Sequence, residues 1–561
     1  MKYLKNNKYT ILAIVLLSCL MFYFIGQKQG FHEDEIFSYG SSNYKYDNVY
    51  RSFGDMEARN DILYNKVLTG NIKNRIANTV KYLKDPDSFP KDNQLSLEIP
   101  IFKTKDKALE YVSIQKYDIF NYFSVYYNQA LDVHPPLFYF LVHFISTFFY
   151  NSFSKYIIFT LNLIFFIGTL ILIDKIMNSL NHKELSIPTM IIYGASMGCI
   201  STVMFQRMYM MLTFFSILYL YNTLKFIKND FNISNKKLWT LNILLGFLTQ
   251  YYFCIYIVLV FILVSIYLFI NKKYKEWFNY FKIHLIGALI GIVFYPFSIE
   301  DIFFSYRGIG SSEAHTLTFI QSFKYYICQI LKLFSLNNII TYLFIIFIVY
   351  LIYKIISKQI PKVNKNNVLI FLLLFIPTIF FILVISKIAP FLGENYTSRY
   401  IMLLFPIIAI TMFYLLTFIT DKHLFIITLI ISILLSTNGL INTTPTYLYK
   451  DYAKAINLAN NYSDDYFVYV YDNYFTHLNS IQEFMIYKEH IILNHNIHDF
   501  KLLDNEKLND SNEFILCIKS WLNQEEILEK VLEGSGYNKY EKLLELNSDV
   551  ESVYYKITKG N

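Results

Sequence analysis

Long apolar runs separated by short polar loops constrain this chain more than any other feature. Hydrophobic residues make up 54% of its 561 residues, and charged residues only 17%. A soluble globular protein carries nearer a quarter charged residues. Crossing about 30 Å of hydrocarbon takes roughly 20 apolar residues in a helix. The sequence therefore predicts a polytopic α-helical membrane protein.

About eleven transmembrane helices are expected. The first, 9–27, follows three lysines and precedes no small-residue cleavage pattern, so we expect a retained span and not a signal peptide. The apolar stretch 238–270 is divided at 249–252, because 33 residues are too many for one untilted span. The predicted spans are 9–27, 155–174, 187–205, 208–226, 238–252, 253–270, 280–299, 331–353, 368–386, 400–419 and 424–440.

The lysines predict the orientation of these spans. With the amino terminus in the cytoplasm, the inside loops hold many lysines, and the short outside loops hold little beyond Arg207, Lys387 and Arg399. This is a strong positive-inside bias. The run that follows two prolines, 136–150, is short for a span, and counting it as one would reverse every later loop. We expect it to form a half-buried helix at the membrane interface.

Two polar segments lie outside the membrane in this topology. Residues 28–133 are too many for an ordinary connection and should cap the membrane part, so that 1–440 forms the transmembrane domain. Residues 446–561 predict a small extracytoplasmic α/β domain, with strands at 466–471 and 514–518 and a helix from Asn523 to Gly534.

Charge and cysteine content exclude other classes. The net charge of +7 is modest and its lysines sit in short loops, which fits membrane orientation better than nucleic-acid binding. The five cysteines are scattered, so neither a disulfide framework nor a metal cluster is indicated.

An acidic stretch follows the first span. Glu33, Asp34 and Glu35 are consecutive carboxylates at the mouth of a membrane helix, where charge is costly to hold near lipid. They could form a solvated turn that stops the helix. A half-buried carboxylate with a like charge beside it could instead act as a base, because both conditions raise a carboxyl pKa.

Other unusual polar groups are predicted on the same face. Arginine presents a rigid fork that matches phosphate oxygens, so Arg207 and Arg399 are candidates for a phosphate clamp. Each has an alternative: His134 could cap a helix, Arg207 could snorkel, Arg399 could pair with Glu394, and Gln250 could be interfacial packing. The groups are Asp34–Glu35, Asp132–Pro136, Gln206–Tyr209, Thr249–Tyr252 and Glu394–Tyr400.

The ordered set resembles the GT-C glycosyltransferases, most closely the bacterial branch related to protein O-mannosyltransferases and the lipid A aminoarabinose transferase. The resemblance rests on the acidic pair, on His134-Pro135-Pro136-Leu137-Phe138-Tyr139, on Arg207-Met208-Tyr209 and on Arg399-Tyr400, and covers roughly 1–440. Many relatives have a histidine where this chain has Gln250.

The resemblance implies an inverting transfer from a polyprenyl-phosphate sugar to an acceptor outside the cytoplasm. Asp34 would be the base and Glu35 its neighbour, both catalytic. His134 would shape the wall of the first loop. The implied substrate-binding residues are His134, Arg207, Tyr209, Gln250, Arg399 and Tyr400.

The acceptor hydroxyl could belong to a protein, a wall polymer or a glycolipid, so protein glycosylation and cell-envelope assembly both stay open. The carboxylates could hold a divalent cation, but no spaced ligand set demands one, and no other cofactor is expected. Two rivals stay open: a transporter or flippase of a lipid-linked sugar, and a catalytically silent scaffold.

Overall fold

The computed structural model divides the chain into two compact units. The membrane unit comprises Met1–Gly26, Val133–Phe138 and Ile158–Thr446, and the sheet unit comprises Gln27–Asp132, Tyr139–Ile157 and Tyr447–Asn561. The residues described are 8–45, 70–85, 88, 101–130, 132–303, 317–336, 365–389, 396–417, 424–472, 474–495, 508, 511–547 and 550–560.

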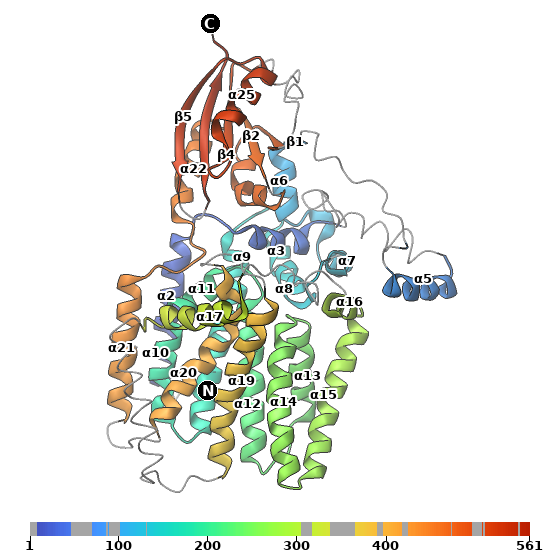
Figure 1. The fold of residues 1–561 in the computed structure, drawn as a ribbon, viewed down its shortest axis with the longest axis vertical. Helices are drawn as coiled ribbons and strands as arrows, with labels where there is room; N and C mark the ends of the chain where they lie inside the picture. The colour runs from blue at the N-terminus through green and yellow to red at the C-terminus, as the bar shows by residue number, and fades with distance from the viewer. Residues whose placement is uncertain are drawn as a thin grey trace. The chain divides into compact units, whose positions relative to one another are not determined.

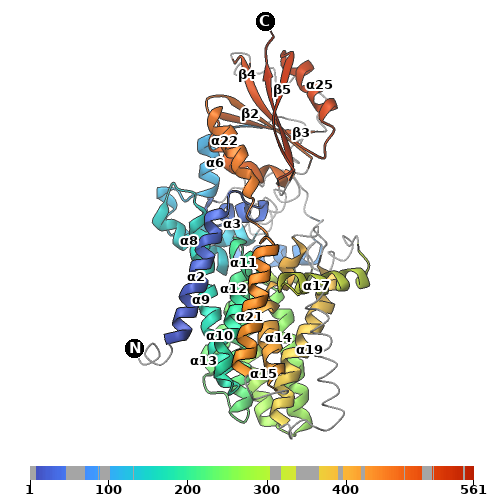
Figure 2. The ribbon, with the colours of Figure 1, turned by 90° about the vertical axis from the view of Figure 1, so that its left-hand side faces the viewer.

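The membrane unit is a bundle of apolar helices. Figure 1 shows α12 to α15 running side by side, while α17 lies across one end of the bundle, as Figure 2 also shows. The helices are α2 (Lys8–Gln27), α9 (Lys155–Ser179), α10 (Ser186–Gly194), α11 (Met197–Met204), α12 (Tyr209–Lys228), α13 (Lys236–Phe247), α14 (Tyr252–Ile270), α15 (Tyr274–Phe294), α16 (Ser298–Phe303), α17 (Phe319–Leu333), α19 (Lys365–Ile388), α20 (Phe405–Leu416) and α21 (Leu424–Asn442).

Within the described residues, eight helices are long and apolar enough to cross a membrane, or nine if α10 and α11, which meet at a 62° bend, form one broken span. The predicted division at 249–252 is confirmed, since α13 ends at Phe247 and α14 begins at Tyr252. At 12 residues, however, α13 is shorter than the predicted span 238–252.

The predicted span 331–353 agrees less well with the structure than the division at 249–252 does. Its first residues end α17, a helix that the sequence pattern did not predict, and most of the rest falls outside the described residues. The segment predicted at 400–419 begins with a 3-10 helix, η7 (Thr397–Leu404), before α20.

Glycines let α13 and α15 approach closely. A Cβ on Gly287 would lie 2.8 Å from the Ile243 side chain, and one on Gly291 would lie 2.6 Å from Phe247. Small residues at such crossings are typical of packed transmembrane helices, where van der Waals contact drives association.

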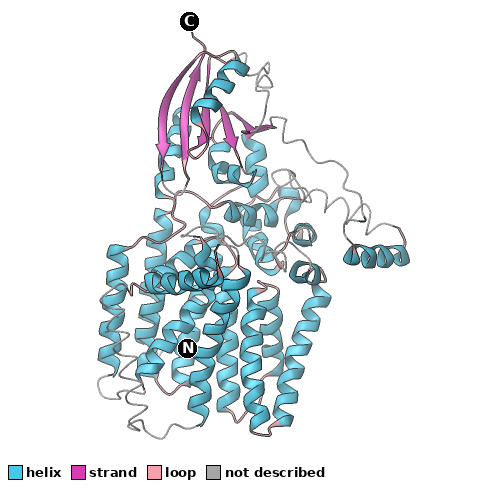
Figure 3. Ribbon diagram, viewed as in Figure 1, coloured by secondary structure: helices cyan, strands magenta, loops and turns pink. Residues whose placement is uncertain are grey.

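The sheet unit holds one mixed sheet of six strands in the order β1-β3-β2-β4-β6-β5. Strands β3, β2 and β4 are parallel to one another, and the pairs β1–β3, β4–β6 and β6–β5 are antiparallel. Figure 3 shows the strands together at one end of the unit. They are β1 (Ile101–Thr104), β2 (Tyr466–Tyr471), β3 (Glu489–Asn494), β4 (Glu513–Lys519), β5 (Lys539–Leu546) and β6 (Ser552–Thr558).

Local sequence explains these elements. All six residues of β2 are buried, as expected of a central parallel strand. Helix α25 (Gln524–Ser535) begins where the Asn523 side chain accepts a hydrogen bond from the Glu526 amide, and it ends at Gly536 with a φ of 74°. The predicted strands and this predicted helix are confirmed. The other helices of the C-terminal part are α22 (Ala453–Asn461) and α23 (Ile481–Phe484).

Strand β1 comes from the first loop and not from 446–561. Ile101 pairs with Ile492 at the edge of the sheet. The rest of the first loop is helical where described, and the short apolar helix α8 follows Pro135 and Pro136 as predicted. Whether 446–561 folds independently stays a prediction. The helices of this region are α3 (Glu33–Asn43), α5 (Ile72–Lys84), α6 (Lys105–Val112), α7 (Tyr122–Ala130) and α8 (Leu137–Ser146).

Candidate active site

The acidic stretch forms the first turn of α3. The backbone N–H of Asp34 donates to His32 Nδ1 at 3.1 Å, and the N–H of His32 donates to Glu35 Oε2 at 2.7 Å. This reciprocal capping satisfies amide groups that the first turn would leave without partners. Carboxylates are also favoured at a helix amino terminus by the helix dipole. The consecutive acids are therefore explained locally as a helix start.

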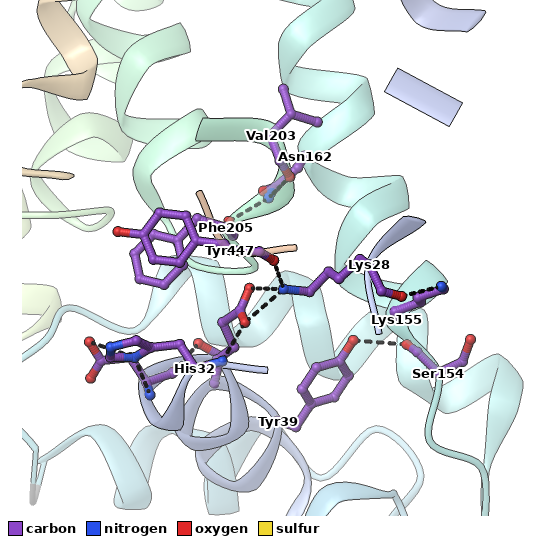
Figure 4. A network of polar contacts seen from close by, with 12 residues as sticks. Lys28, His32, Tyr39, Ser154, Lys155, Asn162, Val203, Phe205 and Tyr447 are labelled. Carbon is purple, nitrogen blue, oxygen red and sulfur yellow. Dashed lines mark hydrogen bonds and ion pairs between the residues drawn. The ribbon is translucent and has the colours of Figure 1, made fainter. Parts of the chain in front are cut away.

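Glu35 is held in a buried ion pair. Lys28 Nζ donates to Glu35 Oε1 at 3.0 Å and to Oε2 at 2.9 Å, and both side chains are fully buried. The same ammonium donates to the Tyr447 carbonyl at 2.6 Å (Figure 4). From the sequence we expected the Glu35 charge to repel the neighbouring Asp34 carboxylate. The Lys28 charge cancels much of that repulsion. We therefore propose a structural role for Glu35 in place of the predicted catalytic one.

Asp34 has a different environment from its neighbour. Its side chain is 14% exposed, whereas that of Glu35 is 0% exposed. Asp34 Oδ2 lies 3.7 Å from His32 Nδ1. Because that nitrogen accepts the Asp34 amide proton, it carries no proton of its own, and the contact is not an ion pair. Asp34 is thus the carboxylate of the predicted pair that reaches solvent.

Packing against other parts of the sheet unit fixes the position of α3. The hydroxyl of Tyr39 donates to the Ser154 carbonyl at 2.8 Å (Figure 4). Asn128 Nδ2 of α7 donates to the Tyr44 carbonyl at 2.7 Å, just beyond the end of α3. A Cβ on Gly40 would collide with the buried Tyr111 ring of α6, so a larger residue there would displace that ring.

In the membrane unit, Arg207 sits in the break between α11 and α12. Asn162 of α9 secures this break, since its Nδ2 donates to the Val203 and Phe205 carbonyls, each at 3.0 Å (Figure 4). The first bond satisfies a carbonyl of the last turn of α11, and the second adds to the Arg207 N–H that the Phe205 carbonyl already accepts at 2.7 Å. Arg207 itself is only 3% exposed. It is therefore a buried arginine and does not snorkel.

His134 lies against this arginine. Arg207 Nη2 is 3.3 Å from His134 Nε2. A guanidinium can only donate, so Nε2 accepts and the imidazole is neutral, with its proton on Nδ1. The Tyr295 hydroxyl reaches the His134 carbonyl at 3.5 Å, and the Leu137 amide donates to the Leu248 carbonyl at 3.0 Å. The segment around the two prolines is thus fixed to the ends of α13 and α15.

Arg399 joins the same group through aromatic rings. Its guanidinium carbon lies 5.9 Å from the Phe205 ring centroid and 5.3 Å from that of Tyr400. Phe205 in turn stacks on Tyr209 with centroids 5.5 Å apart. Cation–π contacts of this kind are favourable where water is excluded. We name this group the arginine cluster: His134, Phe205, Arg207, Tyr209, Arg399 and Tyr400.

Gln250 is not joined to the arginine cluster by any described contact. Its Oε1 accepts the backbone N–H of Tyr251 at 2.6 Å, so its side chain closes the turn before α14. No hydrogen bond or ring contact described for Gln250 joins it to the arginines. Glu394, the alternative partner predicted for Arg399, lies outside the described residues.

Sequence reasoning missed a second acidic pair, Glu300 and Asp301, on α16. Both are buried, and Asp301 Oδ2 accepts a hydrogen bond from the Tyr251 hydroxyl at 2.8 Å. Two adjacent acids at the end of an apolar run were the available signal, the same one that identified Asp34 and Glu35.

Over the described parts of the chain, no group of three or more His, Cys, Asp or Glu side chains comes together as a metal site would require. The expectation that carboxylates could hold a divalent cation stays a prediction.

This arrangement of apolar helices with a small sheet is the GT-C type of fold. The chain is similar to the crystal structure of ArnT from Cupriavidus metallidurans bound to undecaprenyl phosphate. The TM-score is 0.52 at 9% identity, over 98% of each chain. The apo state of the same enzyme aligns with a TM-score of 0.47 at 8% identity, over 98% of each chain. No protein-family model and no curated protein sequence matches the chain.

Proposed function

We propose that this protein is an inverting glycosyltransferase that moves a sugar from a polyprenyl-phosphate donor to an acceptor hydroxyl. The observation that carries the proposal is the arginine cluster, in which buried Arg207 contacts His134 and buried Arg399 lies over the Phe205 ring. The fold supports the same class, since the similar ArnT structure was solved with undecaprenyl phosphate.

In the proposed reaction Asp34 removes the proton from the acceptor hydroxyl. The acceptor oxygen then bonds to the anomeric carbon on the face opposite the phosphate. The bond between that carbon and the phosphate oxygen breaks, and the polyprenyl phosphate leaves with the electron pair. A general base of this kind contributes roughly a hundredfold to ten-thousandfold in rate.

Arg207 and Arg399 would bind the phosphate and stabilise its growing charge as the bond breaks. Such preorganised electrostatic stabilisation is usually the largest single contribution to catalysis. A neutral His134 suits this role, because an imidazole that accepts from Arg207 orients the guanidinium fork without cancelling its charge. Tyr209 and Tyr400 would provide apolar walls for the lipid.

The sheet supports placing the first loop and the C-terminal segment on one side of the membrane. Pairing of β1 with β3 requires 28–133 and 446–561 to lie on the same side of the membrane. The ten spans predicted between them are an even number, as this requires. We propose that this side is extracytoplasmic and that the amino terminus is cytoplasmic.

Thiol labelling in intact cells tests this topology. Single cysteines replace exposed Glu529 or exposed Lys275 in a chain whose five natural cysteines are removed. An impermeant thiol reagent should label position 529 and leave 275 unlabelled until the membrane is opened. Labelling of 275 with protection of 529 would reverse the orientation.

The function itself is tested with purified protein in lipid bilayers, a radiolabelled polyprenyl-phosphate sugar, and an envelope extract as the source of acceptors. Label should move to the acceptor fraction and polyprenyl phosphate should be released in equal amount. Movement of the intact lipid across the bilayer without sugar transfer would instead establish the transporter.

A further inference from the structure

A cavity of about 410 Å³ opens within the membrane unit, away from the arginine cluster, with which it shares no residue. It lies among α9, α12 and α13 and the loop 232–235 that connects the last two. This volume falls within the range of about 300–1,000 Å³ that is usual for small-molecule sites.

The polar part of the lining is basic. Lys175 of α9 and Lys225 of α12 both line the cavity, together with Asn222, Asn235 and Asn242. Among the described residues that line it, none is acidic. Lysine is a common phosphate ligand in proteins, and amide side chains can donate to phosphate oxygens.

The other part of the lining is apolar. Leu238 and Leu241 of α13 line the cavity and are 60% and 45% exposed, respectively. In a transmembrane bundle, such exposed leucines face lipid. The cavity therefore has an apolar side open towards acyl chains and a basic side at the loop end of the helices.

This division matches an amphiphile with an anionic head. The positive-inside rule alone would explain lysines in loops, but it does not require them to line a cavity together with amides and leucines. Basic pockets between transmembrane helices are known to take the head groups of anionic lipids.

We propose that this cavity binds an anionic glycerophospholipid, with its phosphate on Lys175 and Lys225 and its acyl chains along Leu238 and Leu241. The site would be a second lipid site, separate from the proposed donor site. The inference stands whether or not the proposed glycosyl transfer is correct.

Trp239 provides a direct readout, since it lines the cavity and the chain has only three tryptophans. Replacing Trp277 and Trp521 by phenylalanine leaves Trp239 as the sole emitter. The purified protein is placed in vesicles that contain increasing fractions of brominated phosphatidylglycerol or brominated phosphatidylcholine, which quench on contact. Brominated phosphatidylglycerol should reach half-maximal quenching at a mole fraction about fivefold to tenfold lower.

Lys175→Gln/Lys225→Gln should abolish this difference. The matched control, Lys236→Gln/Lys237→Gln, removes two exposed lysines that do not line the cavity and should preserve it. Equal quenching by both lipids, or selectivity that persists in Lys175→Gln/Lys225→Gln, would overturn the proposal. Relief of quenching by unbrominated undecaprenyl phosphate, but not by unbrominated phosphatidylglycerol, would assign the cavity to the polyprenyl lipid and also overturn it.

If the tryptophan replacements prevent folding, the same comparison is made on the unmodified chain. Bound lipid is counted by mass spectrometry after extraction from mixed vesicles. Enrichment of phosphatidylglycerol over its vesicle fraction should be lost in Lys175→Gln/Lys225→Gln. Equal enrichment of phosphatidylglycerol in Lys175→Gln/Lys225→Gln and in Lys236→Gln/Lys237→Gln would contradict the proposal.

Discussion

The acidic turn and the arginine cluster both bury charge, but in opposite ways. In the sheet unit, Glu35 meets the Lys28 ammonium at 2.9 Å, and the two charges cancel. In the membrane unit, Arg207 meets a neutral imidazole and Arg399 lies over aromatic rings. Imidazole and rings position a guanidinium without neutralising it. The first arrangement is therefore suited to holding a fold together, and the second to receiving an anion.

The largest expected effect comes from breaking the ion pair. Lys28→Met would leave Glu35 charged and fully buried, which should cost about 3–5 kcal/mol in the free energy of unfolding. Unfolding can be followed with a dye that reacts as buried Cys517 of the sheet unit becomes accessible.

Two further variants sharpen this test. Lys28→Met/Glu35→Gln removes the stranded charge but keeps an N-terminal capping side chain, so it should recover much of the loss. Lys454→Met removes the partner of Asp451 in an exposed pair and should change stability very little. If Lys28→Met and Lys454→Met unfold alike, Lys28 does not hold Glu35 in a buried ion pair.

Asp34→Asn tests the other carboxylate of the turn. It is nearly isosteric, and the helix cap uses the Asp34 backbone and not its side chain, so folding should survive. Sugar transfer should fall by about a hundredfold or more, while binding of the polyprenyl-phosphate sugar is retained.

Glu33→Gln is the matched control in the same turn and should keep most of the activity. Transfer at the parental rate by Asp34→Asn would remove Asp34 from the mechanism. The buried pair Glu300 and Asp301 would then be the next carboxylates to test.

Arg207→Lys tests whether the arginine cluster grips phosphate. Lysine keeps the charge but loses the bidentate fork. One charge-assisted contact is worth about 1.5–3 kcal/mol, so transfer should fall by about tenfold to hundredfold with normal expression. The loss should be seen in the rate of sugar transfer when the polyprenyl-phosphate donor is varied and the acceptor is saturating. An unimpaired lysine variant would mean that charge alone suffices at this position.

The smallest effect is expected at Asn162, which positions the turn before Arg207. Asn162→Leu keeps the volume but removes the side-chain hydrogen bonds to the Val203 and Phe205 carbonyls. Each lost hydrogen bond is worth about 0.5–1.5 kcal/mol, so transfer should fall several-fold. Combining Asn162→Leu with Arg207→Lys should cost less than the two losses added together, because both act through the same guanidinium. Losses that add would mean that Asn162 and Arg207 act independently.

Much of this molecule could be predicted because its determinants are local. Apolar length predicts the helices, and Asp34, Arg207 and Arg399 stand out as charges where charge is costly. The break at 249–252 follows from helix length alone. What could not be predicted depends on tertiary contacts. In the sequence Lys28 is an ordinary lysine at a helix end, and its burial depends on contacts with distant residues such as Tyr447. Likewise, no local pattern predicts that Asn162 donates to a turn about 40 residues away.

The pairing of β1 with β3 has a consequence for biosynthesis. Ile101 leaves the ribosome about 390 residues before its partner Ile492. At ~5–20 residues per second, β1 is made roughly 20–80 seconds before the strand it pairs with. During that interval β3 has not yet been made, so β1 cannot form this pair. Strand β3 therefore completes the assembly of a segment made much earlier, and a chain truncated before Glu489 would leave β1 without this partner strand.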